Sequence, residues 1–321
     1  MKIVLFRLQY TFAMRKKYYL GIDWGGTYIK AGIVNGSGQI LAKETFVSET
    51  LRDKPVFIEK ICSFAADFKK FHIEGIGIGA PGIVDVQKGF IYYLPNVPGW
   101  EKYPLAGTLE KKLGISVTVD NDANVFALAE TRLGSARGAE RVIFLTLGTG
   151  VGGAVIFGGK LLEGKISALE LGHVPLSLKG KPCGCGGSGC VETFLGNKYL
   201  IASYRSLKKD NEKKLEVKDI YKKALGGEKE ALFVWREFST ALGKFLAGMV
   251  NVFSPEVIVL GGGVSGAFKI FKPWVFAEIK RQAMWPQVTN LKLVRAKLKD
   301  AGIVGAALLA KEKINLSKIR R

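Results

Sequence analysis

Three cysteines lie within eight residues of a glycine-rich loop, in the run CGCGGSGC at 183–190, and His173 precedes them. Three thiolates and one imidazole nitrogen are a ligand set of tetrahedral structural zinc sites. A disulfide is the weaker alternative, because three clustered cysteines cannot all pair and a cytoplasmic protein keeps its thiols reduced. The sequence therefore predicts a zinc site formed by His173, Cys183, Cys185 and Cys190.

Two glycine-rich turns have the composition of phosphate-binding loops. Asp23 precedes the first turn, WGGT at 24–27, and the second, GTGVGG, covers 148–153. Glycine lets backbone amides approach an anion closely, and successive amides form an anion-binding nest. Neither is a Walker A loop, since no Gly-Lys-Ser/Thr opens a helix. One such turn is usually only a turn, but two in matching positions indicate phosphate binding, and Asp23 could reach a phosphate-bound Mg²⁺.

A third glycine run, at 261–263, follows an apolar strand and precedes a predicted helix. Corners of this kind admit a nucleotide to the carboxyl end of an α/β sheet. A tight turn with close helix packing is an equal alternative for this run taken alone.

Several polar side chains close one predicted strand, in the run DNDAN at 120–124. Capping of the following helix explains one Asp or Asn in this place. It does not explain four acceptors crowded beside the expected cleft. A carboxylate here could accept the proton of a substrate hydroxyl during phosphoryl transfer.

The elements that must position these groups form two similar halves. Residues 17–35 and 141–159 both follow the order strand, glycine-rich turn, strand, which indicates a hairpin. Each hairpin is followed later by a buried-looking strand that ends in small residues, at 73–82 and 255–263. This repetition predicts a degenerate internal duplication, with two copies of one α/β unit enclosing a cleft.

Helical periodicity fills the segments between these strands. Helices are expected at 53–71, 123–133, 229–252, 266–283 and 302–313. Strands that alternate with helices predict an α/β protein with mixed sheets. No linker rich in Pro, Gly or Ser separates the halves, so we expect them to share an interface and a hinge.

The composition is that of an ordinary globular protein. Of the 321 residues, 48% are hydrophobic and 24% are charged, which excludes a disordered or fibrous chain. The formal net charge of +20 would attract polyanions. Many lysines are interleaved with acids on predicted helix faces, as solvated faces are, so we expect no specific nucleic-acid partner.

A long uncharged segment, 142–159, contains six glycines and fits two strands and a turn better than a membrane span. The apolar N-terminus carries Arg7 and Gln9 and lacks the small-residue cleavage site of a signal peptide. We therefore expect a cytoplasmic protein with no membrane partner, in which residues 1–16 are an N-terminal extension.

These motifs resemble those of the ROK family (repressors, open reading frames and kinases), within the superfamily of sugar kinases and actin-like ATPases. The most specific match is ELGH at 170–173 followed by CGCGGSGCVE at 183–192, and the resemblance covers nearly the whole chain. It implies an α/β fold of two ribonuclease-H-like (actin-like ATPase) domains with a cleft between them. It also implies ATP-dependent phosphorylation of a hexose, usually on its 6-hydroxyl. Leu169 departs from the pattern, because the family usually has glycine there.

The resemblance implies a role for each site residue and the cofactors ATP, Mg²⁺ and structural Zn²⁺. Asp122 would be the catalytic base, and sugar contacts would come from Asn96, Asn121, Asp122, Glu170, His173 and Glu192. Asp23 would hold the metal and phosphates; further nucleotide contacts would come from Gly25, Gly26, Thr27, Lys30, Thr149, Gly150, Gly261, Gly262 and Gly263. His173 would bind zinc through one ring nitrogen and face the sugar through the other.

The expected organisation is a small α/β domain at 17–121, completed by a C-terminal helix at 302–321, and a large α/β domain at 122–301 that carries the zinc loop. By the same resemblance, the NVPGW segment at 96–100 and the overall pattern imply glucose as the sugar, with N-acetylmannosamine, N-acetylglucosamine, fructose and allose as alternatives. The competing class is a sugar-responsive ROK repressor, but only sixteen residues precede the first core strand, too few for a helix-turn-helix domain. The resemblance also implies a homodimer or homotetramer.

Overall fold

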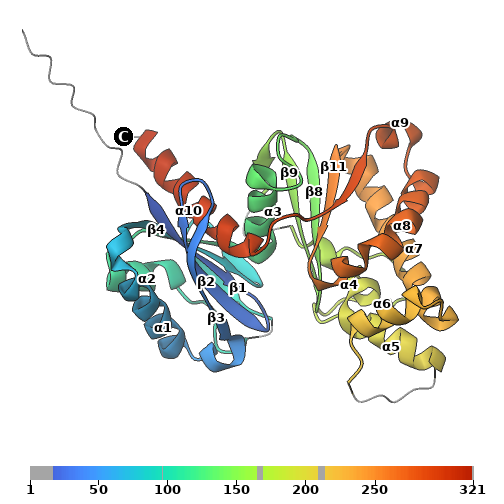
Figure 1. The fold of residues 1–321 in the computed structure, drawn as a ribbon, viewed down its shortest axis with the longest axis horizontal. Helices are drawn as coiled ribbons and strands as arrows, with labels where there is room; N and C mark the ends of the chain where they lie inside the picture. The colour runs from blue at the N-terminus through green and yellow to red at the C-terminus, as the bar shows by residue number, and fades with distance from the viewer. Residues whose placement is uncertain (1–16, 96, 165–168, 209–213, 320–321) are drawn as a thin grey trace, which may run out of the picture.

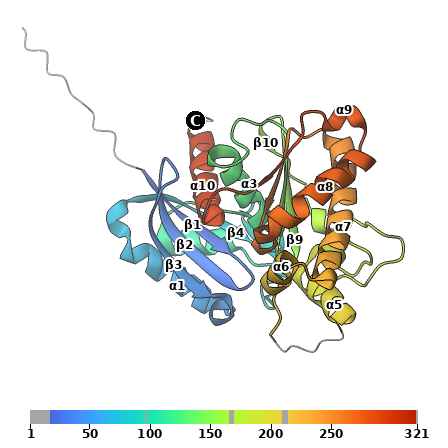
Figure 2. The same ribbon diagram turned by 45° about the vertical axis from the view of Figure 1, so that its right-hand side comes forward.

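Two five-stranded sheets organise the chain, with helices between and around them (Figures 1 and 2). The computed structural model describes residues 17–95, 97–164, 169–208 and 214–319. The expected N-terminal extension, 1–16, and one expected sugar-binding residue, Asn96, lie outside the described residues.

The first sheet has the strand order β3-β2-β1-β4-β7. Its strands are β1 (Tyr18–Trp24), β2 (Tyr28–Asn35), β3 (Ile40–Val47), β4 (Ile73–Ala80) and β7 (Val117–Asn121). β1, β2 and β3 pair antiparallel, whereas β4 runs parallel to both β1 and β7. The carboxyl ends of β1, β4 and β7 therefore meet at one edge. β5 (Ile83–Asp85) and β6 (Phe90–Tyr93) form a separate hairpin.

The second sheet repeats the topology of the first. Its strands are β8 (Val142–Leu147), β9 (Val151–Phe157), β10 (Lys160–Leu161), β11 (Val257–Gly261) and β12 (Lys292–Arg295), in the order β10-β9-β8-β11-β12. β8, β9 and β10 pair antiparallel, and β11 runs parallel to β8 and β12. The predicted duplication into two ribonuclease-H-like units is confirmed, and the two glycine-rich turns occupy matching hairpins.

The second glycine-rich turn is shorter than its sequence suggests. The whole GTGVGG motif was expected to form the turn, but β9 already begins at Val151, which pairs with Leu147 of β8. The N–H of Gly148 donates to the carbonyl of Gly150 at 3.0 Å. This tight connection confines the turn to 148–150, and the later glycines of the motif belong to the strand.

The connections contain helices where the periodicity predicts them. The helices are α1 (Lys54–Asp67), α2 (Leu105–Leu113), α3 (Asp122–Leu133), α4 (Glu192–Leu195), α5 (Asn197–Lys208), α6 (Val217–Leu225), α7 (Lys229–Phe253), α8 (Phe268–Gln282), α9 (Trp285–Val288) and α10 (Ala301–Ile319). Short 3₁₀ segments are η1 (Ser48–Leu51), η2 (Lys69–Phe71), η3 (Leu171–His173) and η4 (Gly263–Ala267). In the described part of the chain, no helix is long and apolar enough to cross a membrane.

α3 and α10 form the layer between the two sheets (Figures 1 and 2). α10 follows the last strand of the second sheet, yet it packs on β1 and β4 of the first sheet and on α3. α3 follows the last strand of the first sheet and also contacts β9 of the second. Both crossovers of the chain between the sheets are therefore anchored in this layer.

Each sheet has a hydrophobic core of its own. The first is centred on the fully buried Trp24, Phe57 and Trp100, and the ring of Trp24 stacks on that of Phe57 with centroids 4.2 Å apart. The second includes Trp235 and Phe271, whose rings stack at 5.9 Å. Burying each such ring stabilises the fold by roughly 1.5–3 kcal/mol, so each half is stabilised by a hydrophobic core of its own.

A side chain at Gly305 would separate α3 from α10. A Cβ there would lie 1.7 Å from the carbonyl oxygen of Val125. We expect Gly305→Ala to lower the free energy of unfolding by about 3 kcal/mol, because overpacking a tight contact forces the backbone to shift. Urea titration measures the change.

The matched control is Gly107→Ala in α2, where an added Cβ meets nothing within 4 Å. Alanine is the better helix former, so this variant should gain roughly 0.5–1 kcal/mol. A Gly305→Ala protein as stable as the parent would contradict the close contact between the helices.

Candidate active site

Two cavities meet at Asp122. The larger, of about 560 Å³, includes residues of both glycine-rich turns, and the smaller, of about 350 Å³, lies against the start of α10. Asp122, Thr146 and Gly262 line both cavities. Asp122 is the first residue of α3, whereas Thr146 lies in β8 of the second sheet. A ligand that extends through both cavities would therefore pass the carboxyl group of Asp122.

Most of the expected site residues line these cavities. The larger contains Gly26, Thr27, Asn121, Asp122, Thr149, Gly150, Glu170, His173, Glu192 and Gly262, and the smaller contains Asp23, Lys30, Asp122, Gly261 and Gly262. Gly25 and Gly263 line neither. Gly25 lies inside the first turn, where its N–H donates to the carbonyl of Tyr28 at 3.0 Å, and Gly263 begins η4.

The carboxyl group of Asp122 is poised to exchange a proton near neutral pH. Burial is the main cause that raises its pKa to about 7, and the negative charges of Asp23 and Glu170 add to the effect. The N–H of Ala123 donates to Asp122 Oδ1 at 2.8 Å and opposes the shift. A base whose pKa lies near the working pH combines a useful ionised fraction with enough basicity to take a proton.

Asn121 holds the start of α3 and lines the larger cavity. Its Oδ1 accepts the N–H of Ala123 at 2.8 Å, which is the capping bond of this helix, and its Nδ2 donates to the carbonyl of Gly82 at 3.2 Å. An amide nitrogen has two hydrogens, so the second remains for a ligand. Asn121 therefore positions Asp122 and can also bind in the cavity.

The smaller cavity brings carboxylates and a lysine together. Burial raises the pKa of Asp23, Lys30 lowers it and Asp300 raises it. Lys30 Nζ lies 3.7 Å from Asp300 Oδ1, and Lys43 Nζ lies 2.6 Å from Asp300 Oδ2. Asp300 therefore partly neutralises Lys30. Carboxylate oxygens are the ligands that Mg²⁺ prefers, and Asp23 and Asp300 supply them here.

Glu170 and Glu192 bring two carboxyl groups into the larger cavity. Glu192 is the first residue of α4, and its Oε2 accepts the N–H of Val151 at 3.0 Å, beside the second glycine-rich turn. Burial raises the pKa of Glu170, His173 lowers it and Glu192 raises it. Carboxylates and an imidazole are acceptors and donors that suit several hydroxyl groups.

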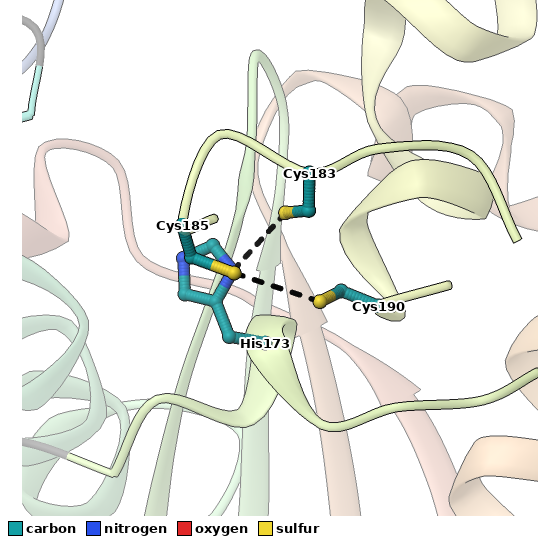
Figure 3. Close-up of side chains that lie close together, drawn as sticks. All are labelled: His173, Cys183, Cys185 and Cys190. Atoms are coloured by element: carbon teal, nitrogen blue, oxygen red, sulfur yellow. Dashed lines mark hydrogen bonds between the residues drawn. The ribbon is translucent and has the colours of Figure 1, made fainter. Parts of the chain in front are cut away.

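His173, Cys183, Cys185 and Cys190 point toward one another (Figure 3). Their ligand atoms all lie within 4.8 Å of one another. Cys183 Sγ is 3.5 Å from His173 Nδ1, and Cys185 Sγ is 3.7 Å from Cys190 Sγ. The structure thus brings together all four residues that the sequence predicts as metal ligands.

The electrostatics of this cluster favour a cation. Burial raises the pKa of Cys190, and the neighbouring sulfur atoms raise it further. A backbone hydrogen bond from Gly187 lowers the pKa of Cys185. Three thiolates side by side repel one another, and a bound cation offsets that repulsion and favours the thiolate form. The donor set therefore fits Zn²⁺ by its chemistry as well as by its spacing.

η3 connects the metal cluster to the larger cavity. His173 directs Nδ1 at the sulfur of Cys183, and its side chain also lines the cavity. A Cβ at Gly172 would lie 2.0 Å from the carbonyl oxygen of Val151, so only glycine lets η3 approach β9 this closely. This contact fixes the flanking Glu170 and His173 beside the second glycine-rich turn.

Sequence analysis missed Arg52, Thr146 and Arg295. Arg52 lines the larger cavity, and its carbonyl accepts the indole N–H of Trp100 at 2.7 Å. Arg295 lines the smaller cavity, and its Nε donates to Ser265 Oγ at 3.3 Å. No motif marks Arg52, because tertiary packing brings it to the cavity. Arg295 ends β12, a strand that the sequence analysis did not predict, so its place at the edge of the second sheet was not foreseen.

The comparisons with known proteins agree with this geometry. The chain is 33% identical over 315 residues to the glucokinase of Thermotoga maritima, and the aligned region covers 94% of this chain and 99% of that protein. It is 34% identical over 308 residues to the N-acetyl-D-glucosamine kinase of Vibrio vulnificus, covering 91% and 98%.

Solved structures and the family profile extend these similarities. A ROK family glucokinase from Streptomyces griseus in complex with glucose and AMPPNP is similar with a TM-score of 0.78 and 32% identity, over 92% of this chain and 99% of that one. The profile described as the ROK family matches residues 19–313. Because the family profile matches this chain over nearly all of its residues, the chain belongs to the ROK family.

Proposed function

We propose that the chain is a hexose kinase that transfers the γ-phosphoryl group of ATP to the 6-hydroxyl of glucose. The observation that carries the proposal is the place of Asp122, at the junction of the two cavities described above. The similarity to a glucokinase of Thermotoga maritima, and to a Streptomyces griseus glucokinase in complex with glucose and AMPPNP, supports it.

In this proposal the triphosphate lies along the glycine-rich turns. Gly26 and Thr27 on one side and Thr149 and Gly150 on the other contact the phosphates, with Gly261 and Gly262 near the adenosine. Asp23 would hold Mg²⁺, which neutralises the charge on the phosphates during transfer. The amides of the turns supply fixed dipoles that need no reorganisation as the reaction proceeds.

Asp122 then serves as the general base. Its carboxylate accepts the proton of the sugar hydroxyl as that oxygen bonds to the γ-phosphorus, and the bond between this phosphorus and the bridging oxygen breaks to release ADP. The hydrogen bonds of Asn121 with Ala123 and Gly82 hold the start of α3, and with it the carboxylate, in place. Glu170, His173 and Glu192 orient the sugar by binding its other hydroxyl groups.

Closure of two domains would exclude water from this reaction. We assign 17–121 with 302–321 to one domain and 122–301 to the other, so that the crossovers β7–α3 and β12–α10 act as hinges. The separate cores of the two sheets support this division. Water is a competing acceptor of the phosphoryl group, so closure protects ATP from hydrolysis.

We assign a structural role to Zn²⁺ at the Cys₃His cluster. His173 would bind the ion through Nδ1 and present the rest of its ring to the sugar. Cys190 lies two residues before Glu192, so the same ion would also fix the start of α4. Removing the ion would loosen several sugar contacts at once, without touching the phosphate-binding turns.

The choice of sugar is tested by coupled ADP release across glucose, N-acetylglucosamine, N-acetylmannosamine, fructose and allose. We expect glucose to give the highest kcat/KM, with disfavoured hexoses at least ~10²-fold lower, because a mismatched hydroxyl leaves buried polar groups unpaired. N-acetylglucosamine is the second candidate, since a 34% identical relative is named for it and Leu169 lines the cavity wall.

A reaction without sugar is the control, because it measures ATP hydrolysis alone. A preference for another hexose would refute the glucose assignment only. No sugar-dependent ADP release across the whole panel would contradict kinase activity itself.

Asp122→Asn should keep the fold and glucose binding but lower kcat by at least ~10², the low end for loss of a general base. In the parent, protonation of Asp122 should make kcat/KM fall as the pH drops below about 7. The expected sign is lower activity in acid, because only the ionised carboxylate can accept the proton.

The matched control for this substitution is Asp67→Asn, at an exposed aspartate in α1, which should turn over like the parent. Near-normal turnover of Asp122→Asn, or a parent profile that stays flat through this range, would exclude Asp122 as the base.

Cys185→Ser should lose zinc and weaken glucose binding together, by about 10-fold or more, because the metal orders the loop that carries the sugar contacts. Elemental analysis measures the zinc and calorimetry the glucose affinity. Cys62→Ser, which changes a thiol outside the cluster, is the control and should leave both unchanged. Normal glucose binding by the zinc-free variant would disprove the ordering role.

A further inference from the structure

The carboxyl group of Asp120 lies buried beneath the start of α3. Asp120 and Asn124 are each only 1% exposed. Asp120 Oδ1 accepts the N–H of Asn121 at 2.6 Å and the side-chain Nδ2–H of Asn124 at 2.8 Å. Asp120 therefore fixes both the residue before Asp122 and the first turn of the helix that Asp122 opens.

The two side chains that share this hydrogen bond each leave one oxygen without a partner. Asp120 Oδ2 and Asn124 Oδ1 are both fully buried, and neither has a hydrogen bond among the described residues. Both atoms are acceptors when the carboxyl group is ionised. Leaving two buried acceptors unpaired is unfavourable, because each loses its hydrogen bonds to water without a replacement, and the penalty is larger for a charged oxygen.

One proton satisfies both atoms. A neutral carboxyl group can pair with a primary amide through two hydrogen bonds, because each partner then has one donor and one acceptor. The observed bond from Asn124 Nδ2 to Asp120 Oδ1 is half of such a pair. The missing half is an O–H on Asp120 Oδ2 that donates to Asn124 Oδ1.

We propose that Asp120 is a neutral carboxylic acid in the folded protein, paired through two hydrogen bonds with the amide of Asn124, and that it acts as a positioning residue for Asp122. The proton comes from solvent as the chain folds. The pairing itself needs no assumption about the reaction, whereas its effect on Asp122 rests on the proposed function.

Burial shifts Asp120 toward the neutral form, and the charges around it do not reverse that direction. Burial raises the pKa of Asp120 to about 6, and a hydrogen bond donated by its own proton would raise it further. Glu163 raises this pKa and Lys313 on α10 lowers it, so their effects oppose each other. Two other acids on elements beside β7 are engaged elsewhere: Glu110 accepts the N–H of Val117, and Asp85 pairs with Lys88.

A neutral Asp120 has a consequence for Asp122. Asp122 already carries a raised pKa, partly through the charge of Asp23. A second ionised carboxyl group two residues away would raise it further and keep more of the base protonated at neutral pH. The neutral pair therefore gives rigid positioning without the penalty of an added negative charge.

Infrared spectroscopy of the whole protein with carboxyl-labelled aspartate tests the pairing directly. At about pH 8 the parent should show the carbonyl band of a protonated, hydrogen-bonded carboxyl group. Asp120→Asn should abolish this band, and Asp122→Asn should retain it, which assigns the band to Asp120. Absence of the band in the parent would overturn the proposal, whether or not any variant folds.

Thermal unfolding gives an independent measurement. Asn at position 120 can form the same two hydrogen bonds with Asn124, so Asp120→Asn should melt no lower than the parent. Because the folded-state pKa is raised, the parent loses stability as pH rises above the unfolded value of about 3.9. The melting temperature of Asp120→Asn, relative to that of the parent, should therefore increase as the pH rises from acid to neutral. A variant that melts lower than the parent at about pH 8 would indicate an ionised Asp120 held by another partner and would refute the pairing.

Kinetics test the positioning role. Asp120→Ala should lower kcat by about 10-fold, because Asp122 is then misplaced. Asp120→Asn should keep most of the parent's kcat. In Asp120→Asn the acid limb of the pH profile of kcat/KM should stay where it is in the parent. A limb displaced to lower pH would show that a negative charge had been removed, against the proposal. Loss of kinase activity in the parent would instead contradict the proposed function and leave the infrared and melting results to decide the pairing.

Discussion

The contact between α3 and α10 is the constraint on which the rest of the site depends. A buried carboxylate reinforces it: Glu130 of α3 accepts the backbone N–H groups of Lys297 and Leu298, at 2.9 and 2.7 Å, in the crossover that leads to α10. Asp122 opens α3 and Asp300 immediately precedes α10. The same contact therefore sets the walls of the smaller cavity, although the residues involved lie far apart in the sequence.

In the larger cavity, the wall formed by η3 and the start of α4 is held in a different way. α4 has only four residues, and η3 has three, so neither can hold a functional side chain rigidly through its own hydrogen bonds. The Cys₃His cluster joins both segments at one point. One cavity wall thus depends on helix packing, and the other would depend on a metal bound by the cluster.

Much of this arrangement could be predicted from the sequence, because local chemistry specifies it. The hairpins around WGGT and GTGVGG, the strand end at Asp122 and the spacing of the three cysteines are short-range signals that need no knowledge of packing. The start of β9 was misjudged because glycines at 152 and 153 suit a turn as well as a strand whose neighbours approach closely. Arg52 escaped notice because tertiary contacts, including the bond from Trp100 to its carbonyl, bring it to the cavity. The contact between Asp120 and Asn124 was also missed, because the residue types do not reveal that both side chains are buried and turned toward each other.

The charge distribution links these features to the proposed reaction. The chain carries a formal charge of +20, yet the cavities contain the carboxyl groups of Asp23, Asp122, Glu170, Glu192 and Asp300. A basic exterior raises the local concentration of an anionic nucleotide over long range, whereas a triphosphate inside the cavities would meet like charge at short range. Burial raises the pKa of all three of Asp23, Glu170 and Asp122. For Asp122 it reaches about 7, so protonation of that carboxyl group near neutral pH relieves part of the conflict. In the proposed reaction a divalent cation at Asp23 would relieve the rest, so the same burial that would make Asp122 a useful base would also favour a nucleotide that arrives bound to a metal.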